Sequence, residues 1–267
     1  TRYLAETRGL TVEEYLLPLI DIASVAPRYV GPALAPGEDI WGVRRKPVSY
    51  GRGAYDEIDH YPLAVVDSAA QLHQHRWPTT AWFDYTVLPQ QIAELNQREP
   101  YCIMVRGGNI FETSWYMRGF QRAFLDLATQ PGLMVEIQER VTDFYVSYCR
   151  EMLRAAEGEI DLVFTADDIG GQQGLLMSLE MWETYLKPHH VRMSAAIHEL
   201  GAKVIYHTDG SVMRAVSGLV DMGVDVLQAL QFDARGMDPV ALKREHGDRL
   251  CFEGGISVQR TLPFGTA

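Results

Sequence analysis

From residue 100 onward, the 267-residue sequence alternates short apolar runs with longer segments of helical periodicity. The apolar runs lie near residues 102, 162, 203, 225 and 250. A strand that leads through a helix to a second, parallel strand forms a right-handed βα unit, and successive units build a parallel sheet. The alternation therefore predicts an α/β fold with a parallel sheet.

Polar residues occur at the C-terminal end of nearly every predicted strand. They are Arg106, Asp167, His207, Gln228 or Gln231, and Glu253. In an open doubly wound sheet, only the strands beside the crevice need polar ends, whereas in a closed barrel all strand ends converge on one mouth. The pattern favours a (β/α)8 TIM barrel with these side chains at its mouth.

Residues 1 to about 100 are irregular, because Pro, Gly and Tyr recur and the helical patterns are short. Thr11 and Glu14 have the spacing of a capping box at the start of one such helix. We expect this part to form helices and loops over one end of the barrel. Residues 1–267 are expected to form a single domain, since such barrels commonly reach about 250 residues. Neither Thr1 nor Ala267 resembles a natural terminus, so residues are expected to be missing at both ends.

The formal net charge of −11 argues against nucleic acid or an anionic membrane surface as a partner, and favours a small molecule or a protein. No apolar run approaches the roughly 20 residues of a membrane span, and no signal peptide opens the chain. Cys102, Cys149 and Cys251 are not spaced as C-x-x-C and are interpreted as small buried hydrophobes. A cytoplasmic protein is expected.

Residues 203–210 form an apolar run that ends in His, Thr, Asp and Gly. Side chains alternate along a strand, so His207 and Asp209 share one face while Thr208 points to the other. An imidazole and a carboxylate then share a pocket where parallel α/β folds carry out chemistry. The alternative is a structural Asp-Gly turn with His207 hydrogen-bonded internally.

Two adjacent acids, Asp167 and Asp168, end the strand at residues 161–166. Alternation sends only one of them into the mouth. Because Asp167 shares a face with Thr165, we expect Asp167 in the cavity with a catalytic role. Asp168 is assigned to the edge of the substrate site, hydrogen-bonded to the turn that follows it.

Several short motifs follow one another along the chain. They are Asp167-Asp168-Ile169-Gly170, Lys187-Pro188-His189-His190, Gly201 to His207, Gly223 to Leu227, Gly236-Met237-Asp238-Pro239, Gly247 to Leu250, Gly254-Gly255-Ile256 and Leu262 to Thr266. In this order and spacing the chain resembles the uroporphyrinogen decarboxylase superfamily of TIM barrels over most of residues 35–267. That superfamily also contains zinc-dependent methyltransferases that exchange a methyl group between a corrinoid and a thiol or another acceptor.

For decarboxylation, the resemblance implies catalytic roles for Asp39, which precedes an isoleucine, and for Tyr116. The segment in which the decarboxylases carry Glu-Ser-x-Ala-Gly reads Ala-Asp-Asp-Ile-Gly at residues 166–170 here, so acids replace the serine. A mouth this rich in carboxylates would repel a substrate with many carboxylates. The decarboxylase is therefore the second hypothesis.

For methyl transfer, the resemblance places His207 and Asp209 where the methyltransferases have His-x-Cys. Zinc accepts carboxylate oxygen as well as thiolate, so a metal site is expected with Glu253, or a residue beyond Ala267, as third ligand. Oxygen and nitrogen ligands leave a more electrophilic metal, which favours an O-methyl or hydroxyl-bearing substrate. Arg106, Gln228 and Gln231 are assigned to substrate binding. Without a metal, His207 and Asp209 would form an acid/base pair.

Three functional hypotheses follow from these residues. The first is a zinc-dependent methyltransferase that works with a separate corrinoid protein docked over the barrel mouth. The second is a decarboxylase of a tetrapyrrole or another acid that needs no cofactor. The third is a binding subunit without catalytic activity. The sequence leaves the oligomeric state open, and a homodimer is one option, since dimers are common in families of this kind.

Overall fold

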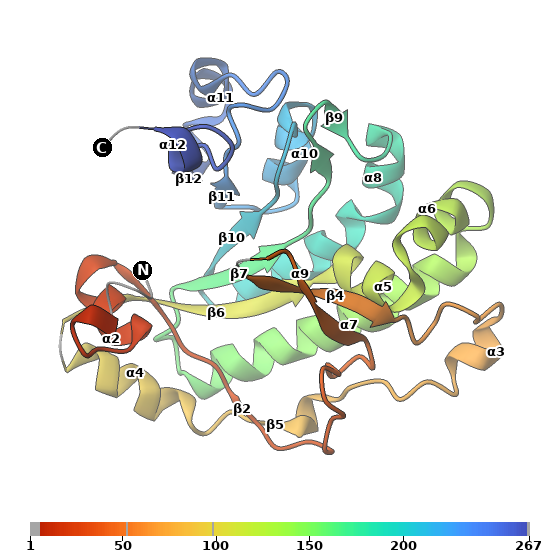
Figure 1. Ribbon diagram of the computed structural model, residues 1–267, viewed down its shortest axis with the longest axis horizontal. Coiled ribbons are helices and arrows are strands. Elements are labelled where there is room, and N and C mark those ends of the chain that lie inside the picture. Colours follow the sequence, from red (N-terminus) through yellow and green to blue (C-terminus); the bar gives the residue numbers. More distant parts are fainter. Residues whose placement is uncertain (1–5, 52, 98, 266–267) are drawn as a thin grey trace.

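A curled parallel sheet of six strands forms the centre of the structure, a computed structural model that describes residues 6–51, 53–97 and 99–265 (Figure 1). In spatial order the strands are β1 (Ile22–Ser24), β6 (Cys102–Asn109), β7 (Leu162–Ala166), β10 (Lys203–His207), β11 (Val226–Ala229) and β12 (Cys251–Gly254). The five strands predicted from the apolar runs are confirmed as β6, β7, β10, β11 and β12. β1 was missed because it is only three residues long and lies in the irregular part of the sequence.

The expected closed (β/α)8 barrel is only partly confirmed. Within the described residues, β1 and β12 are the two edges of the sheet, and no strand joins them. All pairings between neighbouring strands are parallel, so the C-terminal ends of the strands meet along one rim. The described chain is therefore a half-barrel whose polar strand ends share one mouth.

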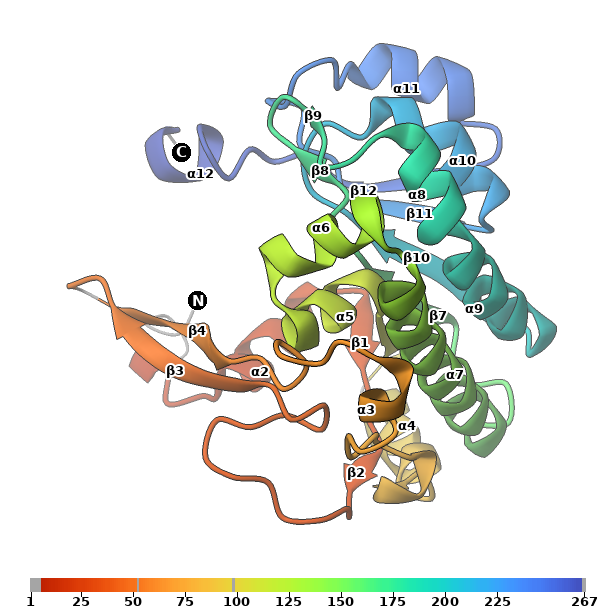
Figure 2. The same cartoon turned by 90° about the vertical axis from the view of Figure 1, so that its right-hand side faces the viewer.

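Helices cover the convex face of the sheet (Figure 2). They include α7 (Gly132–Ala155), α9 (Lys187–Glu199), α10 (Val216–Asp221) and α11 (Pro239–His246). Val105, Val163 and Val204, from three adjacent strands, are fully buried in one apolar cluster with residues of α7 and α9. This packing fixes the orientation of every second residue, so Arg106, Phe164 and His207 point to the concave side.

Two predicted helices are each broken in two. The segment after β6 forms α5 (Ile110–Arg118) and α6 (Phe120–Thr129), because Gly119 between them has φ +92°. The segment after residue 178 forms α8 (Leu179–Tyr185) and α9, with Pro188 in the first turn of α9, where a missing N–H costs least. The predicted cap of α8 is confirmed, since Ser178 Oγ accepts a hydrogen bond from the backbone N of Met181 at 3.1 Å.

The N-terminal part adds a hairpin that the sequence analysis did not predict. Strands β3 (Arg44–Ser49) and β4 (Ala54–His60) pair antiparallel and project away from the half-barrel (Figure 2). The smaller elements here are α2 (Val12–Leu16), η1 (Leu17–Leu19), β2 (Arg28–Tyr29), α3 (Ala69–Leu72), η2 (Thr80–Trp82), β5 (Phe83–Asp84) and α4 (Leu88–Asn96). The capping box is confirmed: the Glu14 carboxylate accepts from Thr11 N at 2.8 Å, and Glu14 N donates to Thr11 Oγ1 at 3.1 Å.

The remaining elements lie around the mouth and the C-terminus. They are β8 (Gly170–Gly171), β9 (Gly174–Leu175), η3 (Met213–Ala215) and α12 (Thr261–Phe264). Across the part of the chain that is described, no helix combines the length and the apolar character needed to span a membrane.

Candidate functional site

Asp168, His207 and Asp209 come together at the C-terminal ends of β7 and β10. One potential ligand atom from each lies within 4.8 Å of the others. The carboxylate of Asp168 accepts a hydrogen bond from Asp209 N at 2.8 Å, and its Oδ1 lies 3.8 Å from His207 Nε2. The predicted common face of His207 and Asp209 is confirmed. Thr208 points the other way, is buried, and accepts a hydrogen bond from Ile169 N at 3.1 Å.

Gln228 fixes the orientation of the His207 ring. The two residues are paired in register on β10 and β11, and His207 Nδ1 is hydrogen-bonded to Gln228 Oε1. An amide oxygen only accepts, so Nδ1 donates its proton to Gln228, and Nε2 is the ring nitrogen left for a metal. Nε2 lies on the side of the Asp168 carboxylate.

Two glycines bring the loops after β7 and β10 into contact. Gly210 has φ +86°, and a Cβ there would lie 2.6 Å from the carbonyl carbon of Gly170. A Cβ on Gly170 would in turn lie 2.6 Å from Asp209 O. Any larger residue at either position would separate the loops that hold Asp168 and Asp209.

The electrostatics of this cluster favour a bound cation. Burial, followed by the nearby Asp168 carboxylate, raises the pKa of Asp209 above its ordinary value. Zinc binds imidazole nitrogen and carboxylate oxygen at roughly 2.0–2.2 Å, so its tetrahedral ligand atoms are roughly 3.4 Å apart. The 3.8 Å gap between His207 Nε2 and Asp168 Oδ1 is too long for a hydrogen bond and close to that spacing. The donor set therefore fits a divalent metal.

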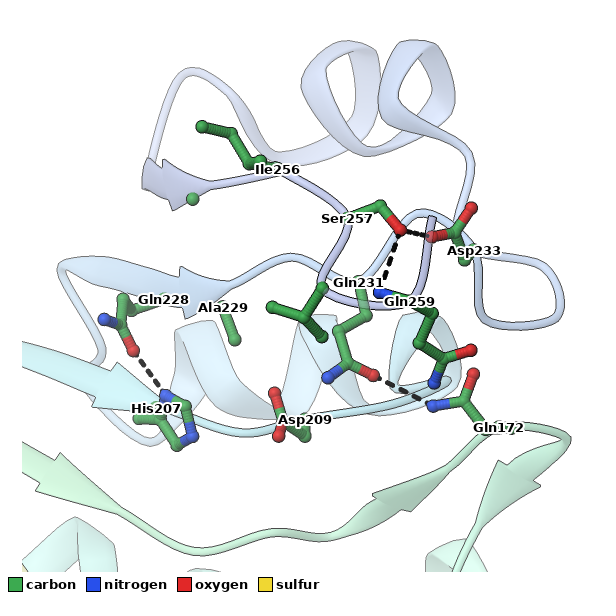
Figure 3. Close-up of a pocket in the computed structure, with 12 residues that line it drawn as sticks. Gln172, His207, Asp209, Gln228, Ala229, Gln231, Asp233, Ile256, Ser257 and Gln259 are labelled. Atoms are coloured by element: carbon green, nitrogen blue, oxygen red, sulfur yellow. Dashed lines mark hydrogen bonds between the residues drawn. The ribbon is translucent and has the colours of Figure 1, made fainter. Parts of the chain in front are cut away.

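A cavity of about 330 Å³ opens beside His207 and Asp209 (Figure 3). Its polar lining includes the amides of Gln172, Gln228, Gln231 and Gln259. Gln231 Oε1 accepts from Gly210 N at 3.1 Å and from Gln172 Nε2 at 3.0 Å. Ala229, which also lines the cavity, has φ +101°, a conformation that L-residues rarely adopt and that is found mainly at functional sites.

The placement predicted for the two adjacent acids is wrong. Asp167 is fully buried on the helix side of the sheet, where its carboxylate accepts from Phe111 N and Glu112 N, each at 2.8 Å, and pairs with His190 Nε2 at 2.6 Å. Asp168 is the acid that reaches the mouth. Asp167 does share a face with Thr165, as predicted, but that face packs on the helices. Both faces of a parallel sheet are buried, so alternation alone does not tell them apart.

Glu253 lies outside the cluster. Glu253 on β12 pairs in register with Gln228 on β11, which in turn pairs with His207 on β10. Glu253 is therefore two strand spacings, or roughly 9.5 Å, from His207 across the sheet. Within the described residues, the third member of the candidate metal set is Asp168 and not Glu253. Glu253 instead lines a neighbouring cavity together with Arg106 and Gln228.

A comparison with family models decides which family this is. The model of the uroporphyrinogen decarboxylase family (URO-D) matches residues 91–265, more than half of the chain. The chain belongs to the uroporphyrinogen decarboxylase family. This match covers β6, β7, β10, β11 and β12, and so all three residues of the candidate metal set.

Among solved structures, this URO-D family member is similar to a methyltransferase from Methanosarcina mazei, with a TM-score of 0.55 and 15% sequence identity. The match covers 82% of this chain and 60% of the methyltransferase, so the chain spans less than two thirds of that protein. At this identity the likeness shows the fold alone. No curated protein sequence matches the chain.

Asp39 and Tyr116, which the resemblance to decarboxylases selected, both contact one arginine. Arg45 pairs with Asp39 Oδ2 at 2.7 Å, and its guanidinium lies 5.1 Å from the centre of the Tyr116 ring. The other oxygen of Asp39 accepts from Trp41 N at 3.0 Å and Val43 N at 3.1 Å. Both carboxylate oxygens of Asp39 thus already have protein partners.

Glu112 is a buried acid near the site that the sequence analysis missed. Its carboxylate accepts from Asn109 Nδ2 at 2.5 Å and from the Tyr116 hydroxyl at 3.1 Å. Burial, followed by the charge of Asp167, raises the pKa of Glu112 to about 7. The Asn-x-x-Glu spacing directly after a predicted strand was the available signal, because it marks the first turn of a helix at the mouth.

Proposed function

We propose that this URO-D family member is a zinc-dependent methyltransferase that moves a methyl group between a small substrate and a corrinoid carried by a separate protein. The observation that carries this proposal is the set of Asp168, His207 and Asp209 at the mouth of the half-barrel. Two carboxylates and one neutral imidazole cancel the charge of a divalent ion and supply the ligand types that zinc accepts. A methyltransferase with the same fold is in keeping with this reading.

The zinc ion would supply Lewis acidity, which activates an oxygen bound to it. The chain itself supplies orientation. Gln228 holds the His207 ring with Nε2 toward the carboxylates, and Gln231 accepts from Gly210 N and so holds the turn that carries Asp209. The amides of Gln172 and Gln231 face the cavity and can both donate to and accept from a substrate hydroxyl.

The cavity beside the proposed metal suits a hydroxyl-bearing or O-methyl substrate group. No lysine or arginine is among the described residues that line it. Asp233, a further acid in the lining, has its own partners in Arg260 at 3.5 Å and the Ser257 hydroxyl. With the metal charge balanced by its ligands, the remaining lining is amide and apolar, which favours an uncharged reacting group.

A cofactor-free decarboxylase is less well supported. Its expected residue Asp39 is hydrogen-bonded through both oxygens, and the Tyr116 hydroxyl donates a hydrogen bond to Glu112. The mouth also concentrates the carboxylates of Asp168 and Asp209, which repel a substrate rich in carboxylates. A binding subunit without activity is the third alternative, and an absence of turnover with normal ligand binding would support it.

Metal analysis tests the centre directly. We expect about one zinc per chain in wild-type protein after mild chelation and zinc repletion, and a large loss in His207→Ala, Asp168→Asn and Asp209→Asn. Glu253→Gln is the matched control and should keep its zinc. Wild-type protein that stays metal-free would overturn the zinc proposal and leave His207 and Asp209 as an acid/base pair.

Methyl transfer is tested with free cobalamin as a surrogate for the corrinoid protein. We expect zinc-loaded protein to methylate cob(I)alamin from small methyl ethers, followed by the change in cobalamin absorbance, and His207→Ala to lose this activity. Uroporphyrinogen and simple carboxylic acids are assayed in parallel for release of carbon dioxide. Decarboxylation without methyl transfer would favour the second hypothesis.

A further inference from the structure

A second cavity, of about 320 Å³, lies between the C-terminal half of β6, β7 and α7. Aromatic side chains form most of its wall. The rings are those of Phe83, Phe144, Tyr145, Tyr148 and Phe164, and Arg106 lies among them. Phe144 stacks on Tyr148 with ring centres 5.6 Å apart, and Phe83 meets the same tyrosine edge-on at 4.9 Å. The rings support one another, so the wall is formed before any ligand binds.

Arg106 is the only charged residue among the described residues that line this cavity. Its guanidinium lies 4.9 Å from the centre of the Phe164 ring, and the side chain is exposed. Within the described residues it forms no ion pair. Asp21 and Glu253 line the adjoining cavity with Arg106, but neither lies within ion-pair distance of it. The positive charge is therefore available to a ligand.

The pairing of β6 with β7 is irregular next to Arg106, because its register shifts between Arg106 and Gly108. Gly108 has φ +123°, and a Cβ there would lie 2.1 Å from the Tyr145 ring. The glycine thus lets the Tyr145 ring of α7 approach β6 two residues beyond Arg106, where both residues line the cavity.

We infer that this cavity is a subsite for an aromatic monocarboxylate, whose carboxylate binds Arg106 and whose ring packs among Phe144, Tyr148 and Phe164. A guanidinium presents a fork of donors that matches a carboxylate, and aromatic walls suit a flat apolar ring. An aliphatic or uncharged ligand would leave either the aromatic wall or the arginine unmatched.

The subsite is next to the candidate metal centre. The Phe164 ring, which forms one wall, lies 6.0 Å from the His207 ring, centre to centre. A substrate held by its carboxylate at Arg106 would extend past Phe164 toward His207. This part of the inference rests on the proposed function, whereas binding of the carboxylate itself does not.

Calorimetry with benzoate tests the inference on the whole chain. We expect benzoate to bind wild-type protein, and Arg106→Gln to weaken binding about tenfold or more, as for loss of a hydrogen bond to a charged group. Arg106→Lys should retain part of the affinity, because it keeps the charge and loses the fork. Arg154→Gln, an exposed arginine at the end of α7, is the matched control and should bind as wild type. Equal binding to wild type and Arg106→Gln, or no binding to wild type, would overturn the inference.

Two further measurements separate this inference from the zinc proposal. Benzamide and cyclohexanecarboxylate should both bind more weakly than benzoate, because the first lacks the charge and the second lacks the aromatic ring. His207→Ala, depleted of zinc, should still bind benzoate with wild-type affinity, because the carboxylate binds Arg106 and not the metal. Loss of benzoate binding in Arg106→Gln with normal zinc content supports the subsite independently of the metal. Benzoate binding by a wild type that stays metal-free after zinc repletion would support the subsite and overturn the zinc proposal.

Discussion

His207 and Gln228 occupy paired positions on β10 and β11, and the ring Nδ1 of His207 is hydrogen-bonded to the side-chain oxygen of Gln228. This relationship selects one tautomer and turns the other ring nitrogen toward Asp168 and Asp209. Outer groups that orient a metal-binding histidine in this way typically change metal affinity by 10–100-fold when they are removed. Gln228 is therefore as informative about the site as the ligands themselves.

Gln228→Leu should lower zinc affinity by roughly 10–100-fold while leaving the ligands in place. The physical reason is that the His207 ring is then free to rotate and to change tautomer. The measurement is competition with a chromophoric zinc chelator. Gln172→Leu is the control, because the Gln172 side chain lines the same cavity and, among the described residues, hydrogen-bonds to Gln231 and not to His207. Identical affinities for both variants and wild type would show that Gln228 does not orient a zinc ligand.

Asp167→Asn should lower mainly the stability of the fold, and Asp168→Asn mainly zinc binding and activity. Asp167 is fully buried and accepts from two backbone N–H groups at the start of α5 and from His190, so we expect its replacement to cost about 3 kcal/mol of unfolding free energy. Asp168 is partly exposed, so its replacement should lower the zinc content and the activity with little change in the free energy of unfolding. Urea unfolding and metal analysis on both variants check this. A stable Asp167→Asn with low activity would restore the assignment expected from the sequence.

Gly210→Ala should reduce both stability and zinc affinity. Its φ of +86° and the 2.6 Å approach of a Cβ to Gly170 leave no room for a methyl group, so the Asp209 loop must move. We expect a loss of about 2 kcal/mol or more. Gly174→Ala is the matched control, since nothing lies within 4 Å of its added Cβ and its φ is ordinary. Thermal melts and zinc titration give the two readouts, and an unchanged Gly210→Ala would contradict this geometry.

Glu112→Gln should flatten the pH dependence of stability. Burial and Asp167 raise the pKa of Glu112 from 4.5 to about 7, so the folded state binds this proton more tightly than the unfolded state. The resulting stabilisation is complete below about pH 4.5 and is lost as pH rises to 7 and beyond, an effect of at most about 3 kcal/mol. Unfolding free energies from pH 5 to 8 should fall in wild type and fall less in Glu112→Gln. Glu183→Gln, on the exposed side of α8, serves as the control.

The sequence determined the features that depend on neighbours along the chain. The parallel strands, the caps at Ser178 and at Thr11 with Glu14, and the common face of His207 and Asp209 all follow from local periodicity and hydrogen bonding. Such patterns repeat every two or about four residues, so they can be read without knowing what packs against them. The family resemblance rested on the same local motifs, and the family match confirms it.

Only the tertiary structure decided which of these residues meet. The sequence gives no sign that Val163 and Thr165 face the helices, and this orientation buries Asp167 and brings Asp168 to His207. The sequence also does not reveal the order of the strands in the sheet. The observed order puts Gln228 between His207 and Glu253, and so excludes Glu253 from the metal set. Both faces of a parallel sheet are apolar, and distances across it depend on pairing and curl, so the composition of the site was fixed by packing between segments far apart in the chain.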